Sequence, residues 1–381
     1  MEFIANFISF GGSFFSYAIP FLFVLTVVVF FHELGHFWVA RRCGVKIDAF
    51  SVGFGPELLG FNDRHGTRWK LCAIPLGGYV RFHGDDSAAS TPDLKALEKM
   101  DEAEKRISFF HQPVRNRAAI VSAGPIANFI LAVVIFSTIF MIYGRQVTTP
   151  RIDSIQPASA AAEAGLQPGD LVLTIDGRAV ANFSDMQRVV SGSPGVPLRI
   201  VVQRDNREVL VTATPRLQEI KDNFGNSHRI GLLGISRATS REEVVTERYG
   251  PIQAVQLGVA ETYFVVERTL SYVGGLITGR EATDQLGGPI RIAQISGQVA
   301  SISFAALLHL TAVLSVSIGL LNLFPVPLLD GGHLVFYAIE AIRGKPLSER
   351  AQEYGFRVGL ALVVMLMLFA TWNDIMHLTA L

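Results

Sequence analysis

The sequence predicts a multi-span α-helical membrane protein with four transmembrane helices, an inserted α+β domain and a membrane-associated β-hairpin. The chain of 381 residues has a mean hydropathy of +0.37 and only 17% charged residues, which is apolar for a soluble protein of this size. Four apolar runs are each long enough to cross a bilayer, since about 20 helical residues span the ~30 Å hydrocarbon layer. A long segment of a different, strand-rich texture lies between the second and third runs.

The four runs contain very few ionisable side chains. Glu33 is the only certain charge in the first run, His309 is the only ionisable group in the third, and Arg357 lies near the start of the fourth. No Lys or Arg precedes Arg41, so the N-terminus lacks the basic region of a secretory signal, and we expect the first run to be retained. The predicted spans extend over residues 19–40, 118–143, 304–324 and 354–372.

Basic residues flank the spans unequally and thereby predict the orientation of the chain. They lie in the connection between the first two spans and in the connection between the last two: Arg41, Arg42, Lys46, Arg106, Arg115, Arg117, Arg343, Lys345 and Arg350. Both connections should therefore face the cytoplasm. The N-terminus, residues 144–303 and the C-terminus are then expected outside the cytoplasm.

Charge and cysteine content exclude some classes of partner. The chain has 33 Lys and Arg residues against 33 Asp and Glu residues, so bulk electrostatics favour no nucleic-acid partner. Its two cysteines, Cys43 and Cys72, fall in the predicted cytoplasmic part of the chain. We expect them to be reduced thiols.

Residues 147–239 are predicted to form an extracytoplasmic α+β domain of about 90 residues. Asp185–Val190 fits a short helix, and residues 240–303, with two helix-like stretches, are predicted to be a connector on the membrane surface. Residues 1–143 and 304–381 would then hold the first two and the last two spans. Residues 151–155 and 170–175 alternate like half-buried strands, and residues 198–204 and 208–214 flank Asp205-Asn206 like the two arms of a hairpin.

The pentapeptide His32-Glu33-Leu34-Gly35-His36 lies inside the first predicted span. On a helix, the H-E-x-x-H pattern puts two imidazoles at i and i+4 on one face, with a carboxylate between them that can take a proton from water. This is the pattern of a zinc site. The alternative is that the three side chains are buried without a metal, and each would then need hydrogen-bond partners at membrane depth, where ionisable groups are costly.

A catalytic zinc ion usually takes three protein ligands and keeps one position open. The best source of the third ligand is Asn322–His333, with the sequence NLFPVPLLDGGH, because its two prolines break the third span. Irregular backbone at membrane depth is tolerated where it lines an enclosed or watery cavity. We favour Asp330 as the ligand over a simple turn-forming role. His333 is a rival ligand, and His309 is interpreted as a span histidine.

Two segments between the first and second spans have distinct textures. Ile74–Phe82 combines glycines with strand-forming residues and is predicted to be a β-hairpin or loop near the membrane surface. Ser87–Arg106 is polar and mixed in charge, which is typical of an exposed loop or surface helix.

Together these motifs resemble the bacterial site-2 protease family of intramembrane zinc metalloproteases. Asn322–Gly331 matches the family's N-x-x-P-x-P-x-x-D-G motif, and Gly124-Pro125 with Asn128 matches the start of its second span. Pro75–Phe82 matches its glycine-rich membrane-associated hairpin. Pro157–Asp170 matches the hallmark stretch of bacterial PDZ domains, so the inserted domain is expected to be PDZ-like. The chain has one such segment, whereas some members have two in tandem.

The resemblance implies a zinc metalloendopeptidase with one Zn²⁺ per chain, held by His32, His36 and Asp330. Glu33 is then the catalytic base, and Asn322 is expected to hold the substrate backbone. Two further sets of residues are expected to contact substrate peptides. They are the hairpin residues Gly77, Gly78, Tyr79 and Val80, and the residues of the PDZ-like domain Gly231, Leu232, Leu233, Gly234 and Ile235.

The resemblance also implies regulated intramembrane proteolysis in the bacterial inner membrane. Expected substrates are single-span regulatory proteins, such as anti-sigma-factor-like proteins, or signal-peptide remnants. Membrane lipid and, at the PDZ-like domain, peptide C-termini are the other expected partners. Two other classes compete with this one. A catalytically silent scaffold is disfavoured by the intact Glu33 and Asp330, and a metal transporter is disfavoured because the sequence shows no internal transporter repeat.

Overall fold

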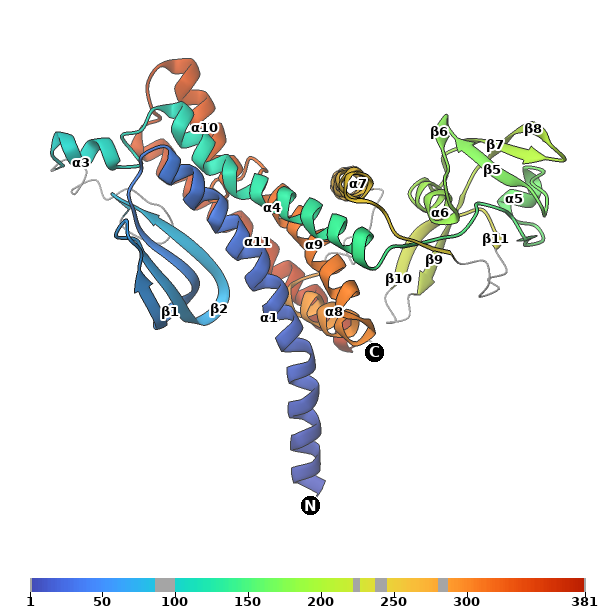
Figure 1. Ribbon diagram of the computed structural model, residues 1–381, viewed down its shortest axis with the longest axis horizontal. Helices are drawn as coiled ribbons and strands as arrows, with labels where there is room; N and C mark the ends of the chain where they lie inside the picture. Colours follow the sequence, from blue (N-terminus) through green and yellow to red (C-terminus); the bar gives the residue numbers. More distant parts are fainter. Residues whose placement is uncertain (1, 86–99, 222–226, 237–244, 280–286, 380–381) are drawn as a thin grey trace. The chain divides into compact units, whose positions relative to one another are not determined.

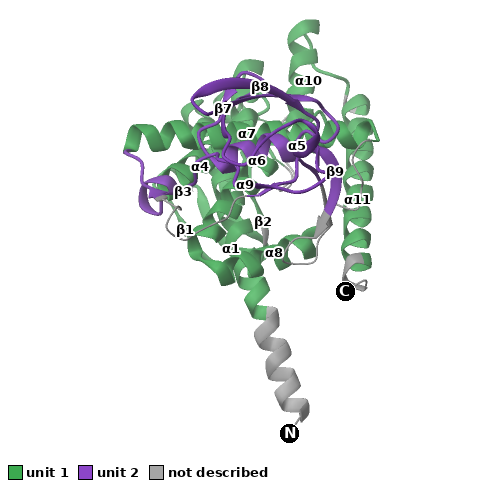
Figure 2. Cartoon of the chain, turned by 90° about the vertical axis from the view of Figure 1, so that its right-hand side faces the viewer, with its two compact units in different colours: residues 1–139, 251–380 green, residues 140–250, 381 purple. Residues whose placement is uncertain are grey.

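The computed structural model describes residues 2–85, 100–221, 227–236, 245–279 and 287–379. The chain forms two compact units, which are coloured separately in Figure 2. The membrane unit comprises residues 1–139 and 251–380, and the inserted unit comprises residues 140–250. Figure 1 labels the helices and strands of both units in chain order.

Four helices of the described chain are long and apolar enough to cross a membrane, which confirms the predicted number of spans. Half of the apolar stretch of the second of these helices is buried against its neighbours. Only 6% of the apolar stretch of the fourth helix is buried. The second is therefore the central helix, and most of the surface of the fourth is left exposed. The four helices are α1 (Glu2–Arg42), α4 (Val114–Ile142), α9 (Phe304–Asn322) and α11 (Glu349–Thr379).

Glycines allow α1, α4 and α9 to approach one another closely. A Cβ atom at Gly35 of α1 would lie 2.3 Å from the carbonyl oxygen of Ala123 in α4. A Cβ atom at Gly319 of α9 would lie 3.1 Å from the Cβ atom of Asn128 in α4. Small residues at such contacts permit the close backbone packing on which helix association in lipid depends. The three helices therefore meet around the part of α1 that carries the H-E-x-x-H motif.

A β-sheet packs against the C-terminal half of α1. Arg41 and Arg42 end this helix, where basic side chains suit the negative end of the helix dipole. The strands β1 (Ile47–Asn62) and β2 (Arg68–Phe82) follow. Their turn is attached to the end of α1 because Arg41 donates hydrogen bonds to Asp63 and Thr67.

The glycine-rich segment Ile74–Phe82 does not form a hairpin by itself, which corrects the sequence-based interpretation. It is the second half of β2, and the turn lies at Asp63–Thr67. The reason is that apolar residues of both strands, including Phe50 and Val80, bury against α1 and extend the pairing. Residues 49–52 have residues 78–81 on one side and residues 68–71 on the other. Residues 78–82 therefore form one edge of the sheet as far as the structure describes it.

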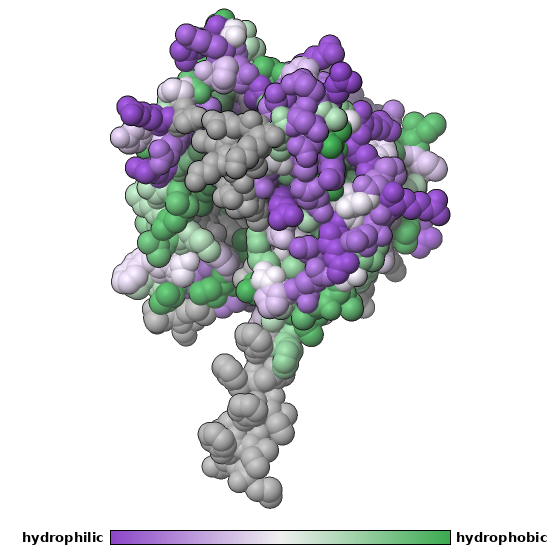
Figure 3. Space-filling model, turned by 90° about the vertical axis from the view of Figure 1, so that its left-hand side faces the viewer, coloured by the Kyte–Doolittle hydropathy of each residue, from purple (hydrophilic) through white to green (hydrophobic). Residues whose placement is uncertain are grey.

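The predicted loop or helix over Ser87–Arg106 lies largely outside the described residues. Its end is α3 (Glu102–Ile107), which begins with a capping box between Asp101 and Glu104. On the face that carries α3 and the sheet, hydrophilic residues cover much of the upper part and the right-hand side, and hydrophobic residues are more frequent lower down (Figure 3). The outer part of β1 contributes exposed apolar side chains, namely Leu58, Leu59 and Phe61.

Two helices from the predicted connector belong to the membrane unit. α7 (Pro251–Ile277) packs on α4 through Gly258, whose Cβ atom would lie 2.5 Å from the Ser137 hydroxyl. α8 (Pro289–Ile302) packs against α1 and α9. The buried carboxylate of Asp374 in α11 accepts hydrogen bonds at the start of α8, from the backbone N–H groups of Gly288, Ile290 and Arg291. An anion at a helix N-terminus is stabilising, so Asp374 attaches the last span to the unit.

A short irregular loop joins α9 to α10 (Asp330–Arg343). The helix ends at Asn322 because the prolines that follow cannot continue it. α10 then folds back onto the loop, since a Cβ atom at Gly331 would lie 2.3 Å from the Leu323 carbonyl oxygen. α11 touches the same loop, because a Cβ atom at Gly359 would lie 1.7 Å from the Pro327 carbonyl oxygen. Glycines on two helices therefore fix the position of the loop.

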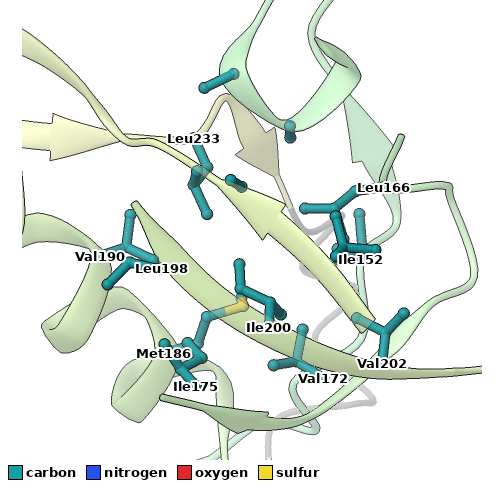
Figure 4. Packing of buried hydrophobic residues seen from close by; sticks show 14 of the residues in the cluster. Ile152, Leu166, Val172, Ile175, Met186, Val190, Leu198, Ile200, Val202 and Leu233 are labelled. Atoms are coloured by element: carbon teal, nitrogen blue, oxygen red, sulfur yellow. The ribbon is translucent and has the colours of Figure 1, made fainter. Parts of the chain in front are cut away.

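The inserted unit is built on a four-stranded sheet with strand order β6-β5-β7-β8. Its buried core includes Val172, Ile175 and Ile200 from the sheet and Met186 from the helix that covers it (Figure 4). The predicted strands at 170–175, 198–204 and 208–214 and the predicted helix at 185–190 are confirmed. These elements are β5 (Leu171–Ile175), β6 (Arg178–Ala179), α6 (Phe183–Ser191), β7 (Leu198–Arg204) and β8 (Arg207–Ala213).

Three two-stranded pairs and a short helix complete the inserted unit. The predicted strand at 151–155 is reduced to β4 (Ser154–Ile155), with one isolated bridge from Arg151 to Leu171. β3 and β12 pair where the chain enters and leaves the unit. The remaining elements are β3 (Arg145–Val147), α5 (Ala160–Glu163), β9 (Arg216–Lys221), β10 (Ser227–Leu232), β11 (Ile235–Ser236) and β12 (Val245–Glu247), with β9 paired to β10 and β11 paired to β4.

Candidate metal centre

The two histidines of the H-E-x-x-H motif point their Nε2 atoms toward each other. Their positions at i and i+4 place the rings on successive turns of α1, with ring centroids 4.8 Å apart and ring planes at 84°. The Nε2 atoms of His32 and His36 are 3.2 Å apart. Both residues are buried, with 9% of their surface exposed. The helix therefore presents two imidazole nitrogens to one point inside the protein.

Asp330 brings a carboxylate oxygen to the same point. It is the first residue of α10, immediately after the broken end of α9. Its Oδ2 atom lies 3.2 Å from Nε2 of His32 and 3.5 Å from Nε2 of His36. Among the described residues these three side chains form the one His, Cys, Asp and Glu cluster able to hold a metal ion.

The spacing of the three donor atoms fits a zinc ion. Zinc bonds to nitrogen and oxygen are about 2.0–2.2 Å long, so donors at tetrahedral angles are separated by about 3.3–3.5 Å. The three observed separations, 3.2, 3.2 and 3.5 Å, agree with that requirement. Two imidazoles and one carboxylate also match the usual ligand chemistry of catalytic zinc, which leaves a fourth position open. The residues present therefore fit the ion.

Helix α4 contacts the outer nitrogen of each imidazole. Nδ1 of His36 donates a hydrogen bond to the Ile120 carbonyl oxygen over 2.9 Å. Because a carbonyl can only accept, the proton of this ring is on Nδ1, and Nε2 presents its lone pair. Nδ1 of His32 lies 3.2 Å from the side-chain amide of Asn128, which is fully buried. Between these two contacts Gly124 leaves room for both rings, since its Cβ atom would lie 2.3 Å from Nε2 of His36 and 2.9 Å from Cε1 of His32.

A cavity of about 240 Å³ opens beside the three donors. The strand residues Gly78, Tyr79 and Val80 form part of its wall. Glu33 also lines it, and the backbone N–H of Val80 is hydrogen-bonded to the Glu33 carboxylate. Asn322, at the end of α9, is another lining residue. The cavity therefore combines the three clustered donors, a second carboxylate, a side-chain amide and one edge of a β-sheet.

The loop before Asp330 has one residue in an unfavourable backbone conformation. Leu328 has a φ of 99°, a region that favours glycine, and it also lines the cavity. Such strain persists only where the surroundings hold it, and it is common at functional sites. Here Gly331 and Gly359 pack the loop between α10 and α11.

The structure separates the other sequence candidates. His333 lines the cavity but is not part of the three-donor cluster. His309 lies on α9 with its ring 5.3 Å from that of Phe136. Gly77 does not line the described cavity, and its Cβ atom would contact Phe54 of β1. The role of α4 was not predicted, although the i+4 spacing of Ile120, Gly124 and Asn128 could have indicated one face of a helix.

The inserted unit contains a second hollow, a groove of about 350 Å³. One wall is α6, with Met186, Gln187 and Val190 among its lining residues. The other wall consists of residues 230–235, which include all five candidate peptide-binding residues of this unit. Gly231 allows the two walls to come close, because its Cβ atom would lie 2.4 Å from the Val190 carbonyl oxygen.

Comparison with known proteins identifies the class to which the fold and the metal centre belong. The model of peptidase family M50 matches residues 20–366, and the chain belongs to this family. The resemblance to site-2 proteases is thereby confirmed. The protein is a zinc metalloprotease with Zn²⁺ as its cofactor, and its four apolar helices make it an integral membrane protein.

Named relatives agree with this assignment over nearly the whole chain. "Putative zinc metalloprotease Atu1380" of Agrobacterium fabrum is 51% identical over 362 residues, which cover 95% of this chain and 96% of the relative. "Metalloprotease MmpA" of Caulobacter vibrioides is 41% identical over 378 residues, which cover 93% of this chain and 94% of the relative. The similarity therefore includes the membrane unit and the inserted unit together.

Proposed function

We propose that this zinc metalloprotease cleaves peptide bonds in the transmembrane segments of single-span regulatory proteins or signal-peptide remnants, in regulated intramembrane proteolysis. The proposed zinc ligands are His32, His36 and Asp330. The observation that carries the proposal is the place of this cluster. Its two histidines lie on a span-length helix, α1, against a second span-length helix, α4. A peptide bond reaches this cavity most directly if it is itself part of a membrane segment.

The chemistry follows from the groups around the cavity. Zinc, when bound, supplies Lewis-acid polarisation of the scissile carbonyl and of water. Glu33 takes the proton from the attacking water and delivers it to the leaving amide nitrogen. The N–H of Val80 holds the Glu33 carboxylate beside the cavity before substrate arrives. Asn322 donates its side-chain amide to a substrate carbonyl and keeps that part of the substrate extended.

A transmembrane substrate must unwind before it is cut, because the carbonyls of a helix are occupied by its own hydrogen bonds. We propose that Gly78, Tyr79 and Val80 receive the unwound segment by β-augmentation, with Gly77 shaping the strand. In support, residues 78–82 form an edge of the sheet and four of them line the cavity. Gly78 permits the approach to the catalytic carboxylate, since its Cβ atom would lie 3.3 Å from Cγ of Glu33.

The distribution of basic residues supports an orientation in the bacterial inner membrane with the active site toward the cytoplasm. His36 is five residues before Arg41, so it lies roughly 7–8 Å from that end of α1 at helical rise. The exposed apolar side chains of β1, Leu58, Leu59 and Phe61, suit a sheet that contacts lipid. The inserted unit would then lie outside the cytoplasm.

We propose that the inserted unit is a PDZ-like domain that docks peptide C-termini or filters substrates by size. The groove between α6 and residues 230–235 supports this role, because it is lined by Gly231, Leu232, Leu233, Gly234 and Ile235. Such grooves receive an extended peptide alongside a strand. Deletion of residues 147–239 should accordingly broaden the range of membrane proteins that are cut, and it should leave zinc binding unchanged.

Substitution Glu33→Gln tests the proposed function. In proteoliposomes that contain a single-span reporter, this variant should retain zinc and lose cleavage by at least about 100-fold, the usual contribution of a general base. The variant should also trap substrates in native membranes, where mass spectrometry can identify them. Glu353→Gln on α11 is the matched control, since Glu353 is exposed and pairs with Arg357 one turn away on the same helix.

Two outcomes would contradict the proposal. If Glu33→Gln cut the reporter at the wild-type rate, Glu33 would not be the base. If wild-type protein cut only soluble peptides and never the membrane-embedded reporter, the proposal that it cleaves transmembrane segments would be wrong. A biological phenotype that Glu33→Gln leaves intact would instead support a scaffold.

A further inference from the structure

One face of α4 makes contact with both proposed zinc-binding imidazoles. Ile120, Gly124 and Asn128 follow one another at i+4 spacing and therefore lie on the same side of the helix. Ile120 accepts a hydrogen bond from His36, Gly124 makes space for both rings, and Asn128 meets His32. Three successive turns of α4 thus determine the orientation of the two imidazole rings.

The contact between Asn128 and His32 determines which nitrogen of that ring can bind a metal. A ring nitrogen that binds zinc must present its lone pair, so the proton of a neutral imidazole has to be on the other nitrogen. For His32 the nitrogen that faces the metal point is Nε2. Nδ1 must then carry the proton, and its neighbour must be an acceptor. The only oxygen that Asn128 can offer from its side chain is Oδ1.

The amide of Asn128 has an oxygen available for this purpose. Its Nδ2 atom lies 3.2 Å from Nδ1 of His32, while its Oδ1 atom has no hydrogen-bond partner among the described residues. The two ends of an amide have almost the same shape, and a half-turn exchanges them. With the oxygen turned toward His32, Oδ1 gains the Nδ1–H donor, and Nε2 of His32 is free to bind the metal.

Packing from α9 holds Asn128 in this place. The Ser315 hydroxyl donates a hydrogen bond to the backbone carbonyl oxygen of Asn128 over 2.9 Å. A Cβ atom at Gly319 would lie only 3.1 Å from the Cβ atom of Asn128, so α9 packs closely against this residue. Asn128 is fully buried between the three helices. The same helix, α9, also leads into the loop that ends at Asp330. One helix therefore supports an outer-shell residue for His32 and positions the third donor.

We infer that Asn128 is a positioning residue of the metal centre, which accepts the Nδ1–H hydrogen bond of His32 through Oδ1 and so fixes the ring form that binds zinc through Nε2. Ile120 performs the same task for His36 with its backbone carbonyl. The inference rests on the proposed ligand set. Outer-shell partners of this kind change metal affinity by about 10- to 100-fold when they are removed.

Two nearly isosteric substitutions test the inference. Asn128→Leu keeps the volume and removes the acceptor, whereas Asn128→Asp keeps an acceptor oxygen. Zinc affinity is measured on the purified full chain by competition with a chromophoric chelator, and Co²⁺ spectra report the coordination. Asn128→Leu should weaken zinc binding by about 10- to 100-fold and alter the Co²⁺ spectrum. Asn128→Asp should bind zinc with an affinity within about threefold of wild type and should give the wild-type Co²⁺ spectrum.

Two reference variants separate this inference from the ligand assignment. His36→Ala should lose zinc altogether, and if it does not, the proposed ligand set is wrong. Asn322→Leu applies the same substitution to an amide in the same cavity, and it should keep wild-type zinc affinity. Wild-type affinity in Asn128→Leu, or equal losses in Asn128→Leu and Asn128→Asp, would overturn the positioning role. Should Asn128→Leu fail to fold, Asn128→Asp alone decides, because loss of zinc from that folded variant also overturns it.

Discussion

Gly124 of α4 faces the Nε2 atom of His36 at a distance that leaves no room for a side chain. A Cβ atom at this position would lie 2.3 Å from that nitrogen and 2.9 Å from Cε1 of His32. Glycine is therefore needed at this position because the imidazole rings of His36 and His32 occupy the space of a side chain, and not because of the backbone conformation. It permits α4 to pass directly beside the metal-binding side of α1.

Gly124→Ala should displace the imidazoles and weaken zinc binding. The clash is with the metal-facing atoms of the rings, so either the rings rotate or the helices separate, and overpacking of this kind costs about 1–3 kcal/mol of folding free energy. Zinc content per chain and the midpoint of thermal unfolding in detergent measure the two effects. Gly274→Ala in α7 is the matched control, since no atom lies within 4 Å of its would-be Cβ, and it should be neutral or stabilising by about 0.5–1 kcal/mol. Full zinc occupancy in Gly124→Ala would show that the rings do not need this space.

The sequence is enough to propose the three metal donors, because their chemistry is local. His32 and His36 are one helical turn apart, and the prolines before Asp330 mark a break in a span, so pattern and composition suffice. The partners of the two rings could not be found in the same way. Asn128 lies 96 positions from His32 in the chain, and only the packing of α4 against α1 brings them together. Likewise the position of the turn in the β1–β2 hairpin depended on burial against α1, which the strand pattern of Ile74–Phe82 did not contain.

Protonation of Asp170 should loosen the inserted unit at acid pH. Burial alone would raise the pKa of this carboxyl group, but hydrogen bonds from Arg204 and from the Gln167 backbone N–H outweigh burial and hold the pKa below its ordinary value of 3.8. Because the pKa is lowered in the folded state, the stabilisation is complete well above pH 3.8. It is lost as the pH falls below 3.8 through the folded-state value. Arg204 joins β7 to the loop before β5 through this contact.

Hydrogen exchange of the backbone amides of β5 and β7 in the full chain measures this effect between pH 7 and pH 3, after correction for the intrinsic exchange rates. Asp170→Asn should lower protection at neutral pH by about 1–3 kcal/mol and should reduce the further loss of protection in acid. Glu208→Gln, an exposed substitution in β8, should leave the wild-type pH dependence unchanged. If Asp170→Asn lost as much protection between pH 7 and pH 3 as the wild type, other carboxylates would be responsible for the loss of stability in acid.

Val80→Pro should impair substrate binding at the cavity while the metal centre stays loaded. The N–H of Val80 points away from β1 toward Glu33, so proline removes a donor from the open edge and leaves the ladder with β1 in place. A substrate strand that pairs with this edge would lose one hydrogen bond, worth about 1 kcal/mol, and KM for a single-span reporter should rise about fivefold. Since the same N–H also contacts Glu33, a misplaced base would instead lower kcat. Val80→Ala keeps the N–H and serves as the control for lost side-chain packing. An unchanged KM in Val80→Pro, or an equal rise in Val80→Ala, would mean that the substrate does not extend the sheet at Val80.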